Sequence, residues 1–131
     1  MRICSGPTKP HFTQEARLLR ILAHPARLAI LEHLRHRPAC VCHLTAALEH
    51  RQAYVSQQLA ILRQAGLIVN RRDGAYTSYA LRDHGALGLV DLARRIPGGL
   101  PTPTLSTTGR VADCACPQCS QDARSVKGAG R

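Results

Sequence analysis

Thiol groups are the side chains in this sequence with the greatest chemical capability, and they are clustered. The chain has six cysteines: a close pair, a C-x-C-x-x-C cluster near the end and one near the start, namely Cys40 and Cys42, then Cys114, Cys116 and Cys119, and Cys4. In a small secreted protein such a set would indicate disulfides, whereas clustered thiols in a reducing cytosol more often bind metal or undergo redox chemistry. The N-terminal stretch lacks an apolar signal core, so we expect a cytoplasmic protein with metal-binding or redox thiols.

The Cys40 and Cys42 pair lies at the expected start of a short helix over residues 41–48. A thiolate is both a metal ligand and a nucleophile, and the positive dipole end of a helix favours the deprotonated form. Nearby Arg37 and His43 can add to this effect. Residues two apart on an ideal helix lie about 200° apart around the axis, so we expect ion binding to distort the helix start. Two buried structural cysteines are the alternative interpretation.

A second stretch, residues 52–67, predicts an amphipathic helix whose two faces have different roles. Val55, Leu59 and Leu62 recur at helical spacing and are expected to face a core, and Gly66 is a natural stop. The outer face carries polar or basic side chains that can hydrogen-bond base edges and phosphates: Gln52, Ser56, Gln57, Arg63 and Gln64. We interpret this stretch as a DNA-reading helix, the alternative being an ordinary surface helix with a polar face.

The charge of the chain favours a polyanionic partner. The formal net charge is +10, and residues 50–82 contain five arginines and one acid, Asp73. Lysine and arginine near phosphates displace condensed counterions, which gives sequence-independent affinity for nucleic acid. Aromatic residues make up only 3% of the chain, so no stacking platform for single strands is expected. Double-stranded DNA is therefore the preferred partner, with basicity for solubility alone as the alternative.

The remaining pattern predicts one domain, mainly α with a small β-hairpin. Helices are expected from Thr13, as cap, to about residue 23, with Ala16, Leu19, Leu22 and Ala23 apolar, and from Pro25 to about residue 36. Asp73-Gly74 indicates a hairpin, or wing, flanked by Arg71 and Arg72.

A closing helix over residues 83–96 carries an apolar stripe that is a candidate dimer surface. The order α-α-α-α-β-β-α is that of a winged helix-turn-helix. We divide the chain into an arm (1–12), this domain (13–96) and a Cys-containing tail (97–131).

Other functional classes receive less support. No apolar run is long enough for a membrane span. Cys116-Pro-Gln-Cys119 is similar to the motif of thiol oxidoreductases but lacks a surrounding βαβ unit, and no catalytic constellation appears, so an enzyme is not expected. A metal-storage protein would not explain the reading helix and wing. His33 and His36, spaced i, i+3, are interpreted as solvated surface histidines rather than ligands.

Three sequence elements resemble the ArsR/SmtB family of metal-responsive repressors over about residues 13–96. They are LAHPARLAILEHL, CVCHLTAAL and QAYVSQQLAILRQAGLIVNRRDGAYTSYAL, in family order and spacing. The resemblance implies a homodimer on a palindromic operator, with Gln52, Ser56 and Gln57 at reading positions and the wing beside the adjoining groove. We add the arginines Arg51, Arg63, Arg71 and Arg72 as DNA contacts. Cys40 and Cys42 match the Cys-x-Cys of the family's arsenical and soft-metal sensors.

The sequence departs from these sensors at the rest of the metal site. Thr45 stands where some arsenical sensors have a third cysteine, and His43 replaces the usual acid. A third sulfur must therefore come from the arm or, preferably, from the tail: Cys4, Cys114, Cys116 or Cys119. The family's alternative site on the closing helix retains Asp83 and His84 but has no ligands at residues 85, 96 and 99.

Thiolate ligands select soft ions, so the expected inducer is a thiophilic metal or metalloid. Three sulfurs suit As(III) or Sb(III) best, while Cd(II), Pb(II) and Zn(II) remain candidates. We expect the metal-free dimer to repress and the metal-bound dimer to release DNA. The alternative is a repressor of the same fold whose thiols sense oxidants or reactive sulfur.

Overall fold

The computed structural model describes residues 11–98. It contains five helices and three strands in that range: α1 Thr13–Leu22, α2 Pro25–Leu34, β1 Ala39–Cys40, α3 Val41–Leu48, α4 Gln52–Gln64, β2 Ile68–Asp73, β3 Tyr76–Leu81 and α5 Gly85–Arg95. This order confirms the winged helix-turn-helix and adds the strand β1, which the sequence pattern did not predict. The candidate third ligands Cys4, Cys114, Cys116 and Cys119 lie outside the described residues. The proposed domain boundaries stay predictions.

The helix ends follow local backbone chemistry. Pro25 occupies the first turn of α2 after an extended His24, where its missing N–H costs no hydrogen bond. Glu49 ends α3 in the left-handed conformation with φ 54°, and Gly66 follows α4 with φ 78°. The prediction for Thr13 was wrong by one position, because Thr13 is the first residue of α1 and Phe12 precedes it without a side-chain cap.

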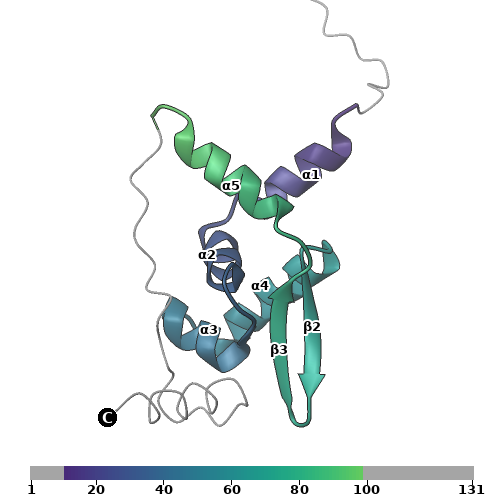
Figure 1. Ribbon diagram of the computed structural model, residues 1–131, viewed down its shortest axis with the longest axis vertical. Coiled ribbons are helices and arrows are strands. Elements are labelled where there is room, and N and C mark those ends of the chain that lie inside the picture. The colour runs from purple at the N-terminus through teal and green to yellow at the C-terminus, as the bar shows by residue number, and fades with distance from the viewer. Residues whose placement is uncertain (1–10, 99–131) are drawn as a thin grey trace, which may run out of the picture.

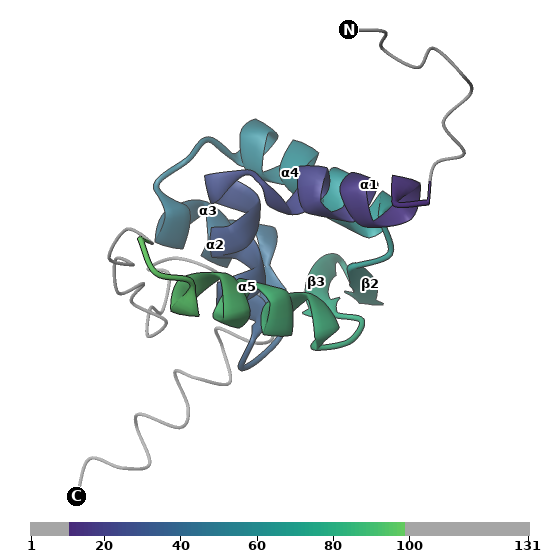
Figure 2. The same cartoon turned by 90° about the horizontal axis from the view of Figure 1, so that it is seen from above.

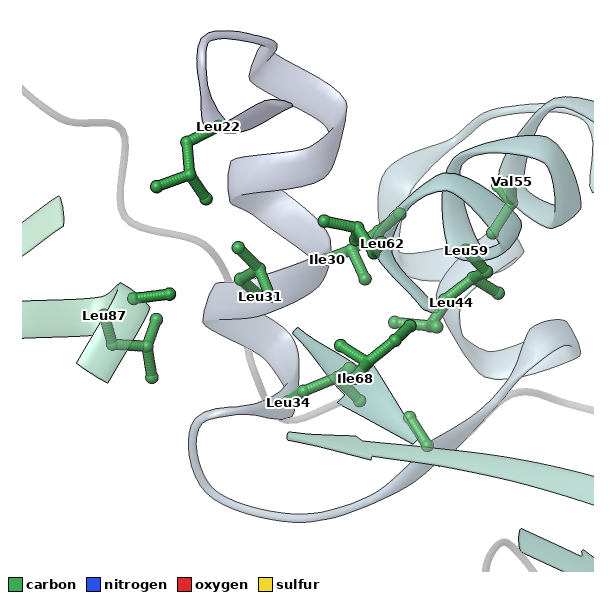
Figure 3. Packing of buried hydrophobic residues seen from close by; sticks show 12 residues of the cluster. Leu22, Ile30, Leu31, Leu34, Leu44, Val55, Leu59, Leu62, Ile68 and Leu87 are labelled. Carbon is green, nitrogen blue, oxygen red and sulfur yellow. The ribbon is translucent and has the colours of Figure 1, made fainter. Parts of the chain in front are cut away.

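The core surrounds α2, which lies between the other helices (Figure 3). Its fully buried side chains come from α2, α3, α4, β2 and α5, and the largest are Ile30, Leu31, Leu44, Leu59, Leu62, Ile68, Leu87 and Val55. The predicted inward positions of α4 are confirmed. Burying one side chain of this kind stabilises the fold by about 1.5–3 kcal/mol, so this cluster fixes where α4 lies.

The strands form an antiparallel sheet in the order β1-β3-β2. Cys40 pairs with Ser78, and Ser78 pairs with Arg71, while Arg72 pairs with Thr77. Directly paired residues project to one face and successive residues alternate, so Cys40, Ser78 and Arg71 share a face and Arg72 projects to the other. The two wing arginines therefore point to opposite sides of the hairpin.

Helices α1 and α5 lie at one end of the molecule, away from the tip of the β2–β3 hairpin (Figures 1 and 2). Of the apolar positions at helical spacing on α1, Leu22 is buried, but Leu19 is 55% exposed and Ala16 and Ala23 are exposed as well. On α5, Leu87 is buried whereas Leu92 is 58% exposed. Both helices thus use one part of their apolar surface inside this chain and leave another part uncovered.

Candidate nucleic-acid interface and thiol site

The outer face of α4 is accessible over its whole length. Its predicted reading and phosphate-binding side chains are all exposed: Gln52, Ser56, Gln57, Arg63 and Gln64. Arg51, immediately before the helix, is exposed too and makes no capping hydrogen bond with its side chain. The burial of Val55, Leu59 and Leu62 holds this face outward, so the helix meets the geometric requirement for inserting into a groove.

The inner face of α4 carries two polar groups that sequence reasoning missed. Gln58 is 6% exposed, and its Oε1 accepts a hydrogen bond from Arg27 Nε at 2.8 Å. Tyr54, one turn earlier, lies with its hydroxyl 3.4 Å from His24 Nε2. The signal was available in the spacing, because Gln58 falls three residues after Val55 and four before Leu62, on the apolar stripe.

The wing presents its arginines at different places. Arg71 and Arg72 are both exposed on β2, but the alternation of the strand separates their side chains. Ser78 Oγ donates to the Arg71 carbonyl oxygen at 3.4 Å, across the hairpin. The two arginines can therefore not contact the same phosphate, and each has a separate role in any complex with DNA.

The thiol pair is already assembled. Cys40 ends β1 with extended backbone (φ −84°, ψ 165°) and is the N-cap of α3, while Cys42 lies in the first turn of that helix. Their Sγ atoms are 2.6 Å apart, and Cys40 Sγ accepts the His43 backbone N–H at 3.4 Å. The premise that both cysteines lie on the helix was wrong, because Cys40 stands before α3, and the distortion on ion binding stays a prediction.

Two buried histidines contact each other, and one of them, His43, directly follows Cys42. The rings of His33 on α2 and His43 on α3 have centroids 6.2 Å apart and meet edge to face. His33 is 5% exposed, which makes its interpretation as a surface histidine wrong, while His36 is exposed as expected. Burial lowers the pKa of His33, the neighbouring His43 lowers it further, and Glu32 partly counteracts both. Neutral imidazole is therefore the stable form of His33 inside the fold.

A charged network joins α2 to α5 on the other side of His33. Arg35 binds Asp91 at 2.7 Å and Glu32 at 3.0 Å, and Arg94 binds Glu32 at 3.3 Å. The hydrogen bond from Arg35 lowers the pKa of Asp91. For Glu32, burial raises the pKa, but the hydrogen bond and charge of Arg35 outweigh it and lower the pKa overall. The network fixes the direction of α5 on the body.

Within residues 11–98 the thiol pair is not part of a larger cluster of candidate metal ligands. That part of the chain holds no group of three or more histidine, cysteine or acidic residues that could bind a metal ion. At the position of the absent third cysteine, Thr45 Oγ1 is buried and has no hydrogen-bond partner among the described residues. Asp83, the retained residue of the closing-helix site, accepts the Gly85 backbone N–H at 2.6 Å and so has a structural role. No helix in the described range is long and apolar enough to cross a membrane.

These features define a winged helix-turn-helix domain: an exposed polar helix, an arginine-bearing hairpin beside it, and a thiol pair at the start of the preceding helix. Residues 24–69 match the family model described as bacterial regulatory protein, arsR family. The chain therefore belongs to the ArsR/SmtB family of transcriptional repressors, as its motifs and the relatives below indicate.

Three curated relatives illustrate the match. The HTH-type transcriptional repressor SmtB of Mycobacterium tuberculosis is 44% identical over 73 residues, which cover 56% of this chain and 54% of the relative. The biofilm growth-associated repressor of Agrobacterium fabrum is 40% identical, with 60% and 68% covered. The arsenical resistance operon repressor of Escherichia coli is 38% identical, with 56% and 63% covered. The match thus spans about half the length of SmtB.

Solved structures agree with the fold. The crystal structure of Rv0081 from M. tuberculosis has a TM-score of 0.62 at 34% identity and covers 68% of this chain and 90% of that one. The solution structure of Mb0332 from Mycobacterium bovis, described as a homodimeric winged helix-turn-helix DNA-binding domain, has a TM-score of 0.58 at 26% identity and covers 69% and 86%.

Proposed function

We propose that this chain is a repressor that binds operator DNA as a homodimer and releases it when a soft metal or metalloid binds Cys40 and Cys42. The observation that carries the proposal is the position of the thiol pair. Cys40 belongs at once to the sheet that forms the wing and to the N-terminus of α3. A change at this residue therefore acts on an element that contacts DNA.

The DNA-binding half of the proposal rests on the exposed faces of α4 and the wing. Glutamine and serine side chains on α4 can pair with base edges in the major groove, and arginines at its ends and on the wing can bind phosphates. The described surface of α4 has no acidic residue to oppose the phosphates. We assign base reading to Gln52, Ser56 and Gln57, and phosphate binding to Arg51, Arg63, Arg71 and Arg72.

The homodimer rests on the uncovered apolar surface of α1 and α5. Phe12 is 75% exposed on the α1 side, and Leu19 and Leu92 are more than half exposed. A second copy that covers this surface would relate the two α4 helices by a two-fold axis, and such symmetry suits a palindromic operator. The printed description of the related Mb0332 structure as homodimeric supports this assignment.

The inducer half rests on the donor atoms. Two converged sulfurs supply part of a thiolate site, and such a site prefers As(III), Sb(III), Cd(II), Pb(II) or Zn(II) over hard ions. We propose that a third sulfur comes from Cys114, Cys116, Cys119 or Cys4. The name of the E. coli relative, an arsenical resistance operon repressor, supports As(III) as the first inducer to test.

Coupling between the two halves follows from shared contacts. Through β1, Cys40 pairs with β3 of the wing, and through α3 it packs against α4. Two thiolates bound to one ion at about 2.3 Å each lie further apart than the 2.6 Å of this pair, so we propose that ligation separates the sulfurs and thereby displaces β1 and the start of α3 relative to these neighbours. A coupling of about 1–3 kcal/mol is typical of allostery and corresponds to roughly 5- to 150-fold in DNA affinity.

The DNA half is tested by Gln57→Ala, with Gln14→Ala on exposed α1 as the matched control. The duplex probe is the sequence that the wild-type chain enriches from a random library. We expect Gln57→Ala to reduce discrimination between this duplex and a single-base variant by about 1–3 kcal/mol while the dimer stays intact. Unchanged discrimination would remove Gln57 from the reading set.

The inducer half is tested by the double variant Cys40→Ser, Cys42→Ser in a mobility-shift assay. We expect this variant to bind the duplex and to stay bound in arsenite, whereas the wild type is released. Release of the double variant would place the sensor elsewhere.

The short Sγ–Sγ separation also favours thiol-redox sensing as a second candidate. In that reaction a peroxide takes two electrons from the two thiols, which form a disulfide as the peroxide is reduced to water. Peroxide in place of arsenite separates the candidates. Release by peroxide alone selects redox sensing, and release by arsenite alone selects metal sensing.

A further inference from the structure

Arg27 is the one described side chain that hydrogen-bonds to groups from α1 and α4 while lying on α2. Its Nη1 donates to the Ile21 carbonyl oxygen at 3.0 Å, in the last turn of α1, and its Nε donates to Gln58 Oε1 at 2.8 Å, in the middle of α4. Planar guanidinium donors have fixed directions, so two such bonds restrict both the separation and the relative rotation of their partners. One side chain thus connects three helices.

A second polar link lies one turn away on the same face of α4. The Tyr54 hydroxyl is 3.4 Å from His24 Nε2, and His24 is the residue immediately before α2. Tyr54 and Gln58 are four residues apart, so both project from one side of α4 toward the junction between α1 and α2. The junction therefore contacts α4 at two successive turns.

We propose that Arg27 and Gln58 form a clamp that sets the angle of the reading helix relative to α1, and thereby the half-site spacing that the dimer accepts. This inference rests on the proposed function, because it requires α1 to contribute to the dimer surface and α4 to read DNA. In a two-fold dimer that is held together through α1 and α5, the separation of the two α4 helices depends on the angle between α4 and α1 within each protomer. Arg27 and Gln58 are thus positioning residues for operator recognition and need no contact with DNA.

The chemistry of the clamp explains why a polar pair occupies a site that leucine could fill. Apolar contacts are non-directional, so leucine at position 58 would bury α4 equally well at several rotations. A hydrogen bond weakens steeply once its angle falls away from linear, so the Arg27–Gln58 pair favours one rotation. Gln58 is nearly fully buried, so leaving its side-chain amide without its partner would destabilise the fold.

The test compares stability with spacing selectivity in four full-length proteins. These are the wild type, Arg27→Met, the double variant Arg27→Met with Gln58→Leu, and Arg20→Met, which removes the same charge from an exposed position on α1. The probes are the duplex that the wild type enriches from a random library and the same duplex with two base pairs inserted at its centre. Melting temperature, dimer mass and affinity for both duplexes are measured at one salt concentration.

The double variant separates a clamp from ordinary packing. Replacing both partners by apolar groups leaves no unpaired amide at position 58, so part of the stability lost in Arg27→Met returns, although the Ile21 carbonyl oxygen lacks its Arg27 donor in both variants. We expect wild-type melting, an intact dimer and wild-type spacing preference for Arg20→Met. For the double variant we expect the melting temperature to recover relative to Arg27→Met, while the preference for the selected spacing falls by about ten-fold, the equivalent of one directional interaction.

Two results would overturn parts of the proposal, and they are distinguishable. A double variant that recovers both stability and spacing preference would make Arg27 and Gln58 packing residues only, with the proposed function intact. A wild-type chain that enriches no duplex would refute the proposed function, and the positioning role would fall with it.

Discussion

The body of the domain, formed around α2 and α4, and the two outer helices, α1 and α5, use their apolar residues differently. In α2 and α4 the large side chains are buried within one chain, with Leu31, Leu59 and Leu62 completely inaccessible. In α1 and α5 only Leu22, Ala86 and Leu87 are buried, while Leu19 and Leu92 remain mostly exposed. The body is thus complete in a single chain, whereas the outer helices have the surface of half an interface. The proposed reading helix and the proposed dimer surface are therefore separate elements, and we propose that the contacts at their junction determine how they act together.

The largest effect is expected from breaking the body. Leu59→Ala removes a fully buried side chain of α4 at its contact with the core. The lost burial and the cavity should reduce the free energy of unfolding by about 2–5 kcal/mol. Thermal and urea unfolding measure this loss, with Leu92→Ala on α5 as the exposed leucine control. Equal losses in the two variants at a concentration where both are monomeric would contradict the division into body and outer helices.

A charge on the outer helices should act on the dimer and not on the body. Leu92→Glu places a carboxylate in the proposed interface, and central apolar contacts of this kind contribute about 2 kcal/mol or more, or about 30-fold in the dimer dissociation constant. Sedimentation equilibrium measures the change. Val69→Glu makes the same kind of substitution at an exposed wing residue and should leave the dimer unchanged. A Leu92→Glu protein that stays dimeric would move the interface away from α5.

The smallest effect is expected at the ion pairs that join body and outer helix. Glu32 and Asp91 have pKa values below their ordinary 4.5 and 3.8, so their contribution to stability is present above these values and is lost as the pH falls below them. Arg35→Gln should therefore lower the melting temperature slightly at pH 7, and its effect should fade as the pH drops through the lowered pKa values of the two carboxylates. A difference from the wild type that persists undiminished at low pH would show that Arg35 acts through packing.

Helix positions and the wing could be predicted because they depend on local signals. Pro25, Gly66 and the Asp73-Gly74 turn fix backbone conformations directly, and the apolar stripe of α4 identifies its inner face. The two-residue strand β1 could not be predicted, because its pairing with β3 depends on a contact between segments distant in sequence. The apolar periodicity of α1 predicted a helix but not which of its apolar residues are buried, since periodicity alone does not tell a core from an interface.

The site was predictable in its residues but not in its geometry. The spacing of Cys40 and Cys42 identifies them as a candidate site. Their sulfurs approach each other because Cys40 is the last residue of β1 and stands before α3, which the spacing does not reveal. The burial of His33 and Gln58 depends on which neighbours cover them, and polar residues on an apolar stripe are ambiguous without those neighbours. The third ligand stays a prediction.

The central claim is that thiol ligation and operator binding oppose each other, and thermodynamic linkage tests it most directly. The measurement is the affinity of the chain for arsenite, followed by thiolate absorption, first for the DNA-free dimer and then for the dimer saturated with its selected duplex. We predict that the duplex weakens arsenite binding by about 5- to 150-fold, the same factor by which arsenite weakens duplex binding. Equal arsenite affinities with and without the duplex would contradict the account.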